Sequence, residues 1–232
     1  MALVEIKNVT KKYGKHKVAL DSVSLTLEKG RIIGLLGPNG SGKTTLIKIL
    51  AGILSKNQGK VKIDGFDIGV ETKKIVSYLP DVSYINDNQK ISQVIAYFCD
   101  FYEDFDRNRA ESMLENLNID LNLKYKTLSK GMKEKVQLVL VMSRRAKLYL
   151  LDEPIAGVDP ASRDYILNTI IRNYDANATI LMSTHLISDI ENILDDIIFI
   201  NDSHIGLVST VDDIRANFGR SVDEHFREVY RC

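Results

Sequence analysis

Hydrophobic and polar residues alternate along the first part of the chain with a period of two residues. Leu3, Glu5 and Lys7 alternate with their neighbours up to Val9, and the same pattern recurs over residues 22–27. A period of two with one polar face is typical of half-buried antiparallel strands. These segments therefore predict an N-terminal antiparallel β subdomain.

The pattern then changes to short apolar runs that alternate with helical stretches. The run Ile32–Leu36 leads into glycine-rich sequence and then into Lys43–Leu50, which has helical spacing. Strands that alternate with helices predict a mixed, mainly parallel sheet in an α/β fold, covered on both faces. Later strands are expected at 147–151 and 178–183, helices at 160–174 and 186–194, a closing hairpin at 197–200 and 205–209, and two short helices at 211–218 and 222–230.

A helical lobe interrupts this alternation, because apolar residues between Ile91 and Leu117 recur at helical spacing. Its aromatic stripe has two interpretations: packing of the lobe, which the spacing favours, or a binding surface. The stripe consists of Tyr97, Phe98, Phe101, Tyr102 and Phe105. We expect one domain over 1–232, with an α/β core from about 1–80 and 145–210, a helical subdomain at about 82–144 and C-terminal helices at 211–232.

Composition and charge limit the function classes. Lys plus Arg and Asp plus Glu both number 31 in the 232 residues, and this balance counts against a nucleic-acid partner. Cys99 and Cys232 have no metal-ligand spacing, so we expect unpaired thiols in a reducing compartment. The apolar runs are shorter than the roughly 18 residues of a spanning helix, and residues 1–9 have no signal-peptide core. The chain is expected to act on a membrane only through a partner.

A phosphate loop is the strongest chemical signal in the sequence. Residues 37–44 match G-x-x-x-x-G-K-[ST] between a predicted strand and a predicted helix, and a chance match is expected in only about one per cent of such chains. Glycine-rich backbone and the helix start bind phosphate, the lysine adds charge, and the hydroxyl is suited to Mg²⁺. We expect ATP and Mg²⁺ here, with candidate ligands Gly37, Pro38, Asn39, Gly40, Ser41, Gly42, Lys43, Thr44 and Thr45.

Two adjacent carboxylates, Asp152 and Glu153, follow the apolar run at 148–151. Ligands of parallel sheets bind beyond the carboxyl ends of the strands, so Asp152 is expected at the metal and Glu153 at the attacking water. A solvated turn is the alternative interpretation, and the phosphate loop in the same chain favours the functional one.

Several further segments resemble those of ATP-binding-cassette (ABC) nucleotide-binding domains, in the order of that family. Leu128-Ser-Lys-Gly-Met132 resembles the LSGGQ signature, Ala156–Asp159 the loop after the catalytic acid, and Ser183-Thr184-His185 the switch histidine. Tyr13 lies where the family stacks an aromatic ring on adenine. The resemblance covers roughly residues 3 to 210 and implies a P-loop NTPase core.

The resemblance also implies how the site works. Two such domains would pair head to tail around two ATP molecules, and the phosphate loop of one chain would meet the signature of the other. Glu153 would be the general base, His185 would contact the γ-phosphate and Asp159 would link the two sites. The signature residues acting in trans would be Ser129, Lys130 and Gly131.

Simpler interpretations exist for some of these residues taken singly. His185 alone is compatible with a structural histidine, Tyr13 with packing, and Ser129 with a helix cap. His16, His204 and His225 match nothing in the family pattern and are expected at the surface.

The sequence departs from the family pattern at three positions. Lys130 replaces a glycine and Met132 a glutamine in the signature, and the LSKGM form resembles a bacterial exporter branch for antibiotic, bacteriocin and lantibiotic self-protection. Asp81 follows the strand near Ser77 where the family has glutamine. A carboxylate is a good Mg²⁺ ligand, so Thr44, Asp81 and Asp152 form the expected metal set.

We therefore expect an ATP-hydrolysing exporter subunit at the cytoplasmic face of the plasma membrane. Its partners would be a second nucleotide-binding subunit, identical or different, and a separate permease whose short helix enters a groove between the Asp81–Gln89 loop and the lobe. One alternative is a regulatory cassette with little turnover. Another is a soluble chromosome-maintenance ABC ATPase, disfavoured because heptads and a basic patch are absent.

Overall fold

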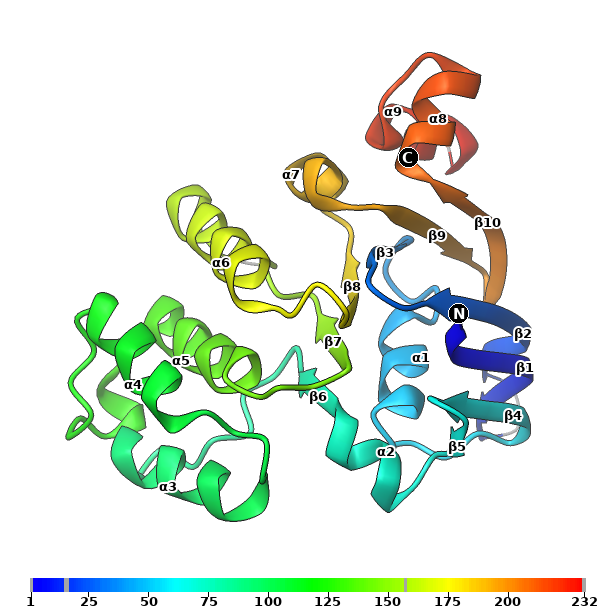
Figure 1. Ribbon diagram of the computed structural model, residues 1–232. Coiled ribbons are helices and arrows are strands. Elements are labelled where there is room, and N and C mark those ends of the chain that lie inside the picture. The colour runs from blue at the N-terminus through cyan, green and yellow to red at the C-terminus, as the bar shows by residue number, and fades with distance from the viewer. Residues whose placement is uncertain (1, 15–16, 157, 231–232) are drawn as a thin grey trace.

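Two sheets form the framework of the protein (Figure 1). The computed structural model describes residues 2–14, 17–156 and 158–230. An antiparallel sheet has the strand order β2-β1-β4-β5, and a larger sheet has the order β10-β9-β3-β8-β7-β6. Neighbouring strands from β9 to β6 are parallel, and β10 adds an antiparallel edge. The predicted α/β fold, with a mixed sheet and an antiparallel N-terminal sheet, is confirmed.

The strands and helices have the following bounds. The strands are β1 (Ala2–Tyr13), β2 (Lys17–Glu28), β3 (Ile32–Leu36), β4 (Gln58–Ile63), β5 (Phe66–Asp67), β6 (Val76–Leu79), β7 (Leu148–Asp152), β8 (Thr179–Thr184), β9 (Asp196–Asn201) and β10 (His204–Thr210). The helices are α1 (Lys43–Leu50), α2 (Val70–Ile75), α3 (Ile91–Phe101), α4 (Arg107–Asn116), η1 (Tyr125–Thr127), α5 (Lys130–Met142), α6 (Pro160–Asn173), α7 (Ile187–Ile190), η2 (Glu191–Ile193), α8 (Val211–Phe218) and α9 (Val222–Tyr230).

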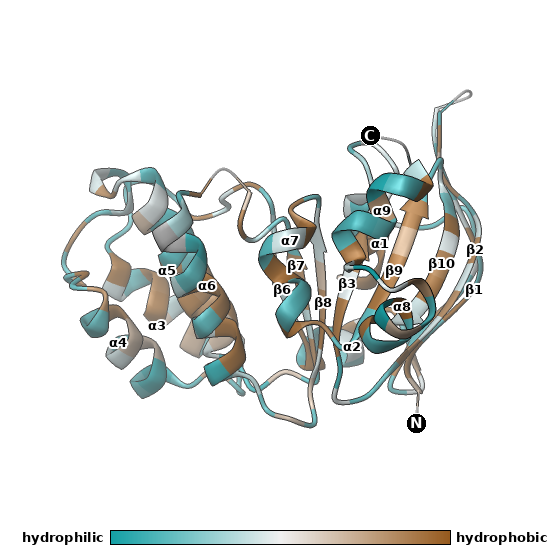
Figure 2. Cartoon of the chain, turned by 90° about the horizontal axis from the view of Figure 1, so that it is seen from above, coloured by the Kyte–Doolittle hydropathy of each residue, from teal (hydrophilic) through white to brown (hydrophobic). Residues whose placement is uncertain are grey.

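The large sheet is the centre of the hydrophobic core. Every residue of β3, β7 and β8 is buried, as expected for parallel strands with both faces covered. Ile33 and Leu35 pack with α1 and the antiparallel sheet, while Ile32 and Leu36 belong to the cluster with α5, α6 and the C-terminal helices. Figure 2 shows hydrophobic residues along these strands and teal, hydrophilic surfaces on the outer helices.

The helices α3, α4 and α5 lie together at one end of the molecule, beyond the β6 edge of the large sheet (Figure 1). We call residues 91–142 the helical lobe. Phe98 is buried in it, and Tyr102 and Phe105 pack against its core, as the packing interpretation predicts. Tyr97 and Phe101 are 50% and 66% exposed, with ring centroids 4.5 Å apart, so that interpretation is wrong for these two rings.

The helix expected over residues 186–194 is shorter than predicted. Helix α7 ends at Ile190, and a 3₁₀ turn, Glu191–Ile193, follows it. The Glu191 carboxylate is buried and accepts hydrogen bonds from Arg215 at 3.0 Å and from the Asp223 backbone N–H at 3.4 Å. These bonds to α8 and α9 accompany the tighter turn.

The C-terminal helices bury a histidine that the sequence pattern assigned to the surface. The His225 side chain is only 7% exposed and stacks on Phe218, with ring centroids 4.1 Å apart. His204 is exposed as expected, while His16 and Cys232 lie outside the described residues. Cys99 is a free thiol. In the described part of the chain, no helix has both the length and the hydropathy of a membrane span.

The buried histidine predicts a pH dependence of folding stability. Burial, and then the charge of Arg220, lower the pKa of His225. The unfolded chain therefore binds this proton at a higher pH than the folded chain, so the free energy of unfolding falls as the pH drops through about 6.5. One proton accounts for at most about 1.4 kcal/mol per pH unit. Urea unfolding at about pH 7.5 and about pH 5.5 should show a smaller loss for His225→Phe than for the wild type; equal losses would contradict the prediction.

Candidate active site

The glycine-rich loop between β3 and α1 is confined by its neighbours. Gly42 has φ 117°, and a Cβ atom there would lie 2.5 Å from the Ala19 carbonyl oxygen. A Cβ atom on Gly37 would collide with the carbonyl oxygen of Ile200 on β9. Glycine is therefore required at both positions, because β2 and β9 approach the loop backbone.

The β9–β10 turn supports the same loop. The Ser203 backbone N–H donates to the Ser41 carbonyl oxygen at 3.2 Å, and the Ser203 hydroxyl donates to the Val18 carbonyl oxygen at 2.9 Å. This turn joins the loop to the antiparallel sheet, so the loop is held from two sides.

The Lys43 side chain lies inside the loop. Its ammonium donates to the carbonyl oxygens of Gly37 at 2.8 Å and Pro38 at 3.2 Å, and lies 3.6 Å from a carboxylate oxygen of Glu153. Burial lowers the pKa of Lys43, and the Glu153 charge opposes that shift. The Lys43 ammonium and the Glu153 carboxylate are therefore neighbours.

Asp152 is the most constrained carboxylate of the site. Its Oδ1 atom accepts hydrogen bonds from the hydroxyls of Thr44 at 3.0 Å and Ser183 at 2.7 Å. Its Oδ2 atom is buried and has no hydrogen-bond partner within the described residues. Burial raises the pKa of Asp152, and the two hydroxyls oppose the shift. A buried oxygen without a partner beside a threonine hydroxyl fits a bound cation such as Mg²⁺.

Asp81 lies on the same side of the site but has a different partner. Its carboxylate is 3.7 Å from the Lys48 ammonium. The charge of Asp81 contributes to raising the pKa of Asp152, and the charge of Lys48 opposes it. No group of three or more His, Cys, Asp or Glu suited to a metal occurs among the described residues, so Mg²⁺ would also need ligands from phosphate and water.

Glu153 is held in an unusual backbone conformation at the end of β7. Its φ is 51°, a left-handed value that costs free energy in a residue with a side chain. Its backbone N–H donates to the Ser183 carbonyl at 3.1 Å and hydroxyl at 3.0 Å. The His185 Nδ1 atom lies 3.0 Å from Glu153 Oε2. The strand end thus directs the Glu153 carboxylate to both Lys43 and His185.

Tyr13 lies beside the start of α1. Its hydroxyl is 3.5 Å from the Thr45 hydroxyl, and 43% of the residue is exposed. The Lys11 ammonium lies 5.4 Å from the centre of the ring. A partly exposed ring next to the phosphate loop does not match the packing interpretation.

The signature residues do not join this cluster within one chain. Ser129 caps α5 by accepting a 3.3 Å hydrogen bond from the Met132 backbone N–H. A Cβ atom on Gly131 would meet nothing within 4 Å. Lys130 is paired with Glu134 at 3.9 Å. Among the described residues, no hydrogen bond or ion pair connects 129–131 with the phosphate loop.

Sequence reasoning assigned no role to two residues of the site. Lys48 follows Thr44 by four positions and therefore lies on the same face of α1, which was the available signal. Ser183 was noted only as part of the segment before His185, although it donates to Asp152. Its importance follows from the pairing of Asp152 with Ser183 across β7 and β8.

A strand, a phosphate loop, a helix and a second strand of the same sheet whose end carries two adjacent carboxylates define a P-loop nucleoside triphosphatase. A profile of the ABC transporter family matches residues 20–156. The chain is 32% identical over 219 residues to the ABC transporter ATP-binding protein YtrB of Bacillus subtilis, covering 93% of this chain and 75% of YtrB. The chain belongs to the ABC transporter family as an ATP-binding subunit; it binds ATP and is an ATPase.

Further relatives agree with this assignment. The linearmycin resistance ATP-binding protein LnrL of Bacillus subtilis is 28% identical, and the alignment covers 94% of this chain and 72% of LnrL. A solved structure described as the ATP-binding subunit of an ABC transporter superposes with a TM-score of 0.88 at 28% identity, covering 98% of this chain and 99% of that one.

The confined loop predicts different costs for two alanine substitutions. Gly40 has φ 84° with no atom near a Cβ position, whereas Gly42 has both a positive φ and the nearby Ala19 oxygen. Backbone strain alone costs about 1–3 kcal/mol, so Gly40→Ala should lose about that amount of stability and Gly42→Ala clearly more, with weaker ATP binding. Urea unfolding and titration with a fluorescent ATP analogue would measure both. Equal losses would show that the contact with Ala19 does not constrain the loop.

Proposed function

We propose that the chain hydrolyses Mg-ATP in a head-to-tail dimer and thereby drives export through a separate membrane subunit. The observation that carries the proposal is the network in which Thr44 and Ser183 bind Asp152 while Lys43 and His185 flank Glu153. This arrangement gathers a phosphate-binding charge, a metal-type carboxylate and a base-type carboxylate at one edge of the sheet.

Each charged residue has a separate role in hydrolysis. Lys43 exchanges its two carbonyl partners for the β- and γ-phosphates of ATP. Glu153 accepts a proton from the attacking water, and His185 orients its carboxylate through the 3.0 Å contact. Because Glu153 is present beside Lys43, turnover is favoured over a purely regulatory, binding-only cassette.

Mg²⁺ would be held by Thr44 and Asp152, with Asp81 as a further oxygen ligand or a partner of its bound water. The unpartnered Oδ2 atom of Asp152 supports this assignment. When bound, the ion neutralises negative charge on the phosphates. In this proposal the Asp81 carboxylate has two uses: it binds the ion or its water, and it pairs with Lys48. The charges of Asp81 and Lys48 both act on the pKa of Asp152.

The dimer is supported by the exposed start of α5. Gly131 has open space around it and no positive φ, so its own chain gives no reason for a glycine there. The start of a helix also presents backbone N–H groups suited to an anion. We propose that Ser129, Lys130 and Gly131 bind the γ-phosphate held by a second copy or a related subunit, and that Asp159 lies between the two sites.

The direction of transport and the membrane partner form the last part of the proposal. The LSKGM signature resembles an exporter branch, and LnrL is named for resistance to linearmycin. The family assignment favours transport over chromosome maintenance. A permease helix would dock beside Val82 and Tyr84, which are 69% and 50% exposed on the loop before the helical lobe. The chain would thus act at the cytoplasmic face of the plasma membrane.

Glu153→Gln is expected to lower kcat by about 10²–10⁴-fold, because an amide cannot accept the proton. ATP binding should persist, and an ATP-bound dimer should accumulate. Steady-state hydrolysis and light scattering with and without Mg-ATP would measure these effects. Glu111→Gln, a change on the surface of α4, is the control and should behave as the wild type. Hydrolysis at the wild-type rate by Glu153→Gln would exclude Glu153 as the base.

Val82→Asp is expected to disrupt docking of the permease without affecting ATP binding. A charge placed in an apolar contact costs about 2 kcal/mol or more, enough to lower recovery of the complex strongly. Tagged chain would be recovered from detergent-solubilised membranes, and the membrane subunit identified by mass spectrometry. Val208→Asp is the matched control, because Val208 is 52% exposed on the β10 edge. Equal recovery with both variants would place the permease elsewhere.

A further inference from the structure

The junction between the helical lobe and the sheet is built around one buried arginine. Helix α5 ends at Met142, and residues 143–147 lead into β7. Arg144 lies in this connection, and its side chain is only 3% exposed. A buried guanidinium needs a partner for each of its donors, so its contacts identify what the junction holds together.

Four hydrogen bonds of Arg144 reach the sheet side of the junction. The guanidinium donates to the carbonyl oxygens of Lys74 at 2.8 Å and Lys73 at 3.4 Å, both in the last turn of α2, and to that of Val76 at the start of β6. The Arg144 carbonyl oxygen accepts a 2.6 Å hydrogen bond from the Tyr149 hydroxyl. Arg144 is therefore fixed to α2, β6 and β7.

The other contacts reach the segment between α3 and α4. Nε and Nη2 of Arg144 donate to the two carboxylate oxygens of Asp104 at 3.0 and 3.1 Å, a two-pronged pair. The guanidinium carbon lies 3.9 Å from the centre of the Tyr102 ring. One planar group thus binds the sheet with one side and the lobe with the other, which an ammonium cannot reproduce.

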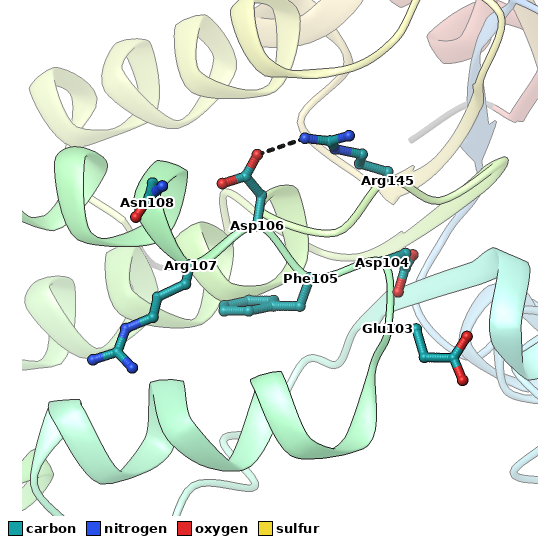
Figure 3. Close-up of a pocket in the computed structure, with 7 residues that line it drawn as sticks. All are labelled: Glu103, Asp104, Phe105, Asp106, Arg107, Asn108 and Arg145. Atoms are coloured by element: carbon teal, nitrogen blue, oxygen red, sulfur yellow. Dashed lines mark hydrogen bonds and ion pairs between the residues drawn. The ribbon is translucent and has the colours of Figure 1, made fainter.

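The neighbouring Arg145 has a different position. Arg145 is one of the residues that line a polar hollow of about 410 Å³. Figure 3 shows its ion pair with Asp106. Its side chain is 74% exposed, and the pair spans 2.9 Å. Arg145 therefore provides a matched arginine on the same connection that lacks the contacts to the sheet.

Helix α5 connects this junction with the signature, so a change in its tilt at one end moves the other end. It has 13 residues and is therefore about 20 Å long, with Ser129 capping one end and Arg144 just beyond the other. A tilt of about 5° at the junction would move the start of the helix by about 2 Å. A displacement of about 1 Å of a reacting group can cost about 100-fold in rate.

We propose that Arg144 is a positioning residue that sets the tilt of α5 and so places Ser129 and Gly131 for the phosphates bound by the partner chain. The inference rests on the head-to-tail arrangement of the proposed function. The inference predicts that Arg144 is needed only in the chain that supplies the signature to a given ATP site. In the chain that supplies the phosphate loop, β6 stays in place because Val76–Leu79 pairs with β7 along its length.

Mixed dimers separate these two roles. A Ser129→Arg chain keeps its phosphate loop but lacks a working signature, and a Lys43→Met chain has the reverse defect. Each alone should be inactive, and the mixture should contain one complete site per mixed dimer. Arg144→Lys is then introduced into one chain or the other, and the ATPase rate of the mixture is measured at saturating ATP.

We expect Arg144→Lys to lower the rate at least about ten-fold when it is in the Lys43→Met chain, and by less than about two-fold in the Ser129→Arg chain. Arg145→Lys should leave the rate unchanged in either chain. ATP affinity of the single Arg144→Lys chain should also stay within about two-fold, since the phosphate loop is untouched. If Arg144→Lys does not fold, Asp104→Asn removes the carboxylate charge from the two-pronged pair and should show the same asymmetry.

Equal losses from both chains, or no loss from either, would overturn the inference and leave Arg144 with a packing role. Failure of the proposed function gives a different result, because the parent mixture of Ser129→Arg and Lys43→Met would then show no activity. In that case both the head-to-tail dimer and the role of Arg144 in the partner's site would be rejected.

Discussion

The carboxylate of Asp152 joins the elements on which the site depends. Through Oδ1 it binds a hydroxyl from α1 and one from β8, while its own backbone belongs to β7. Burying a charge at this depth is unfavourable, and the raised pKa of Asp152 reflects that cost. The hydroxyls of Thr44 and Ser183 offset part of this cost. In the nucleotide-bound state that we propose, a cation offsets more of it. The same constraint places Glu153, the next residue, beside Lys43.

A neighbouring positive charge also accompanies Asp81, the residue that stands where the family has glutamine. A carboxylate there adds negative charge close to Asp152, which would be costly without a counter-charge. Lys48 provides it, at 3.7 Å from Asp81. The pair lies at the partly exposed edge of the site, where such contacts are weak and readily exchanged. Asp81 can therefore change partners at little cost.

Much of the fold follows from local patterns in the sequence. The strand Ile32–Leu36, the helix Lys43–Leu50 and the last two helices have the predicted bounds, because each is a strongly periodic or fully apolar run between clear breaks. Strand β4 and helix α2 were not predicted. Only Val61 and Ile63 are buried in β4, and α2 has six residues, too few for a helical period to appear.

Site residues that belong to a sequence motif could be predicted. Contacts that depend on the order of strands in the sheet could not. The phosphate loop and the two carboxylates follow from spacing, whereas the bonds of Ser183 to Asp152 and of Arg144 to Asp104 join distant parts of the chain. The burial of His225 was readable: it follows Val222 by three positions and precedes Phe226, so it lies on the apolar face of α9. The surface prediction for His225 considered only the family motifs and not this helical face.

Gly42 and Gly131 differ in what the folded chain requires at each position. Gly42 is required by the folded chain itself, through its φ angle and the approach of Ala19. Gly131 has no such requirement within the chain. If a second subunit is what demands a glycine there, a descendant that lost this partner would be free to vary at residue 131 while residue 42 stayed fixed. Natural variation at the two positions would then distinguish lineages that still assemble from those that only fold.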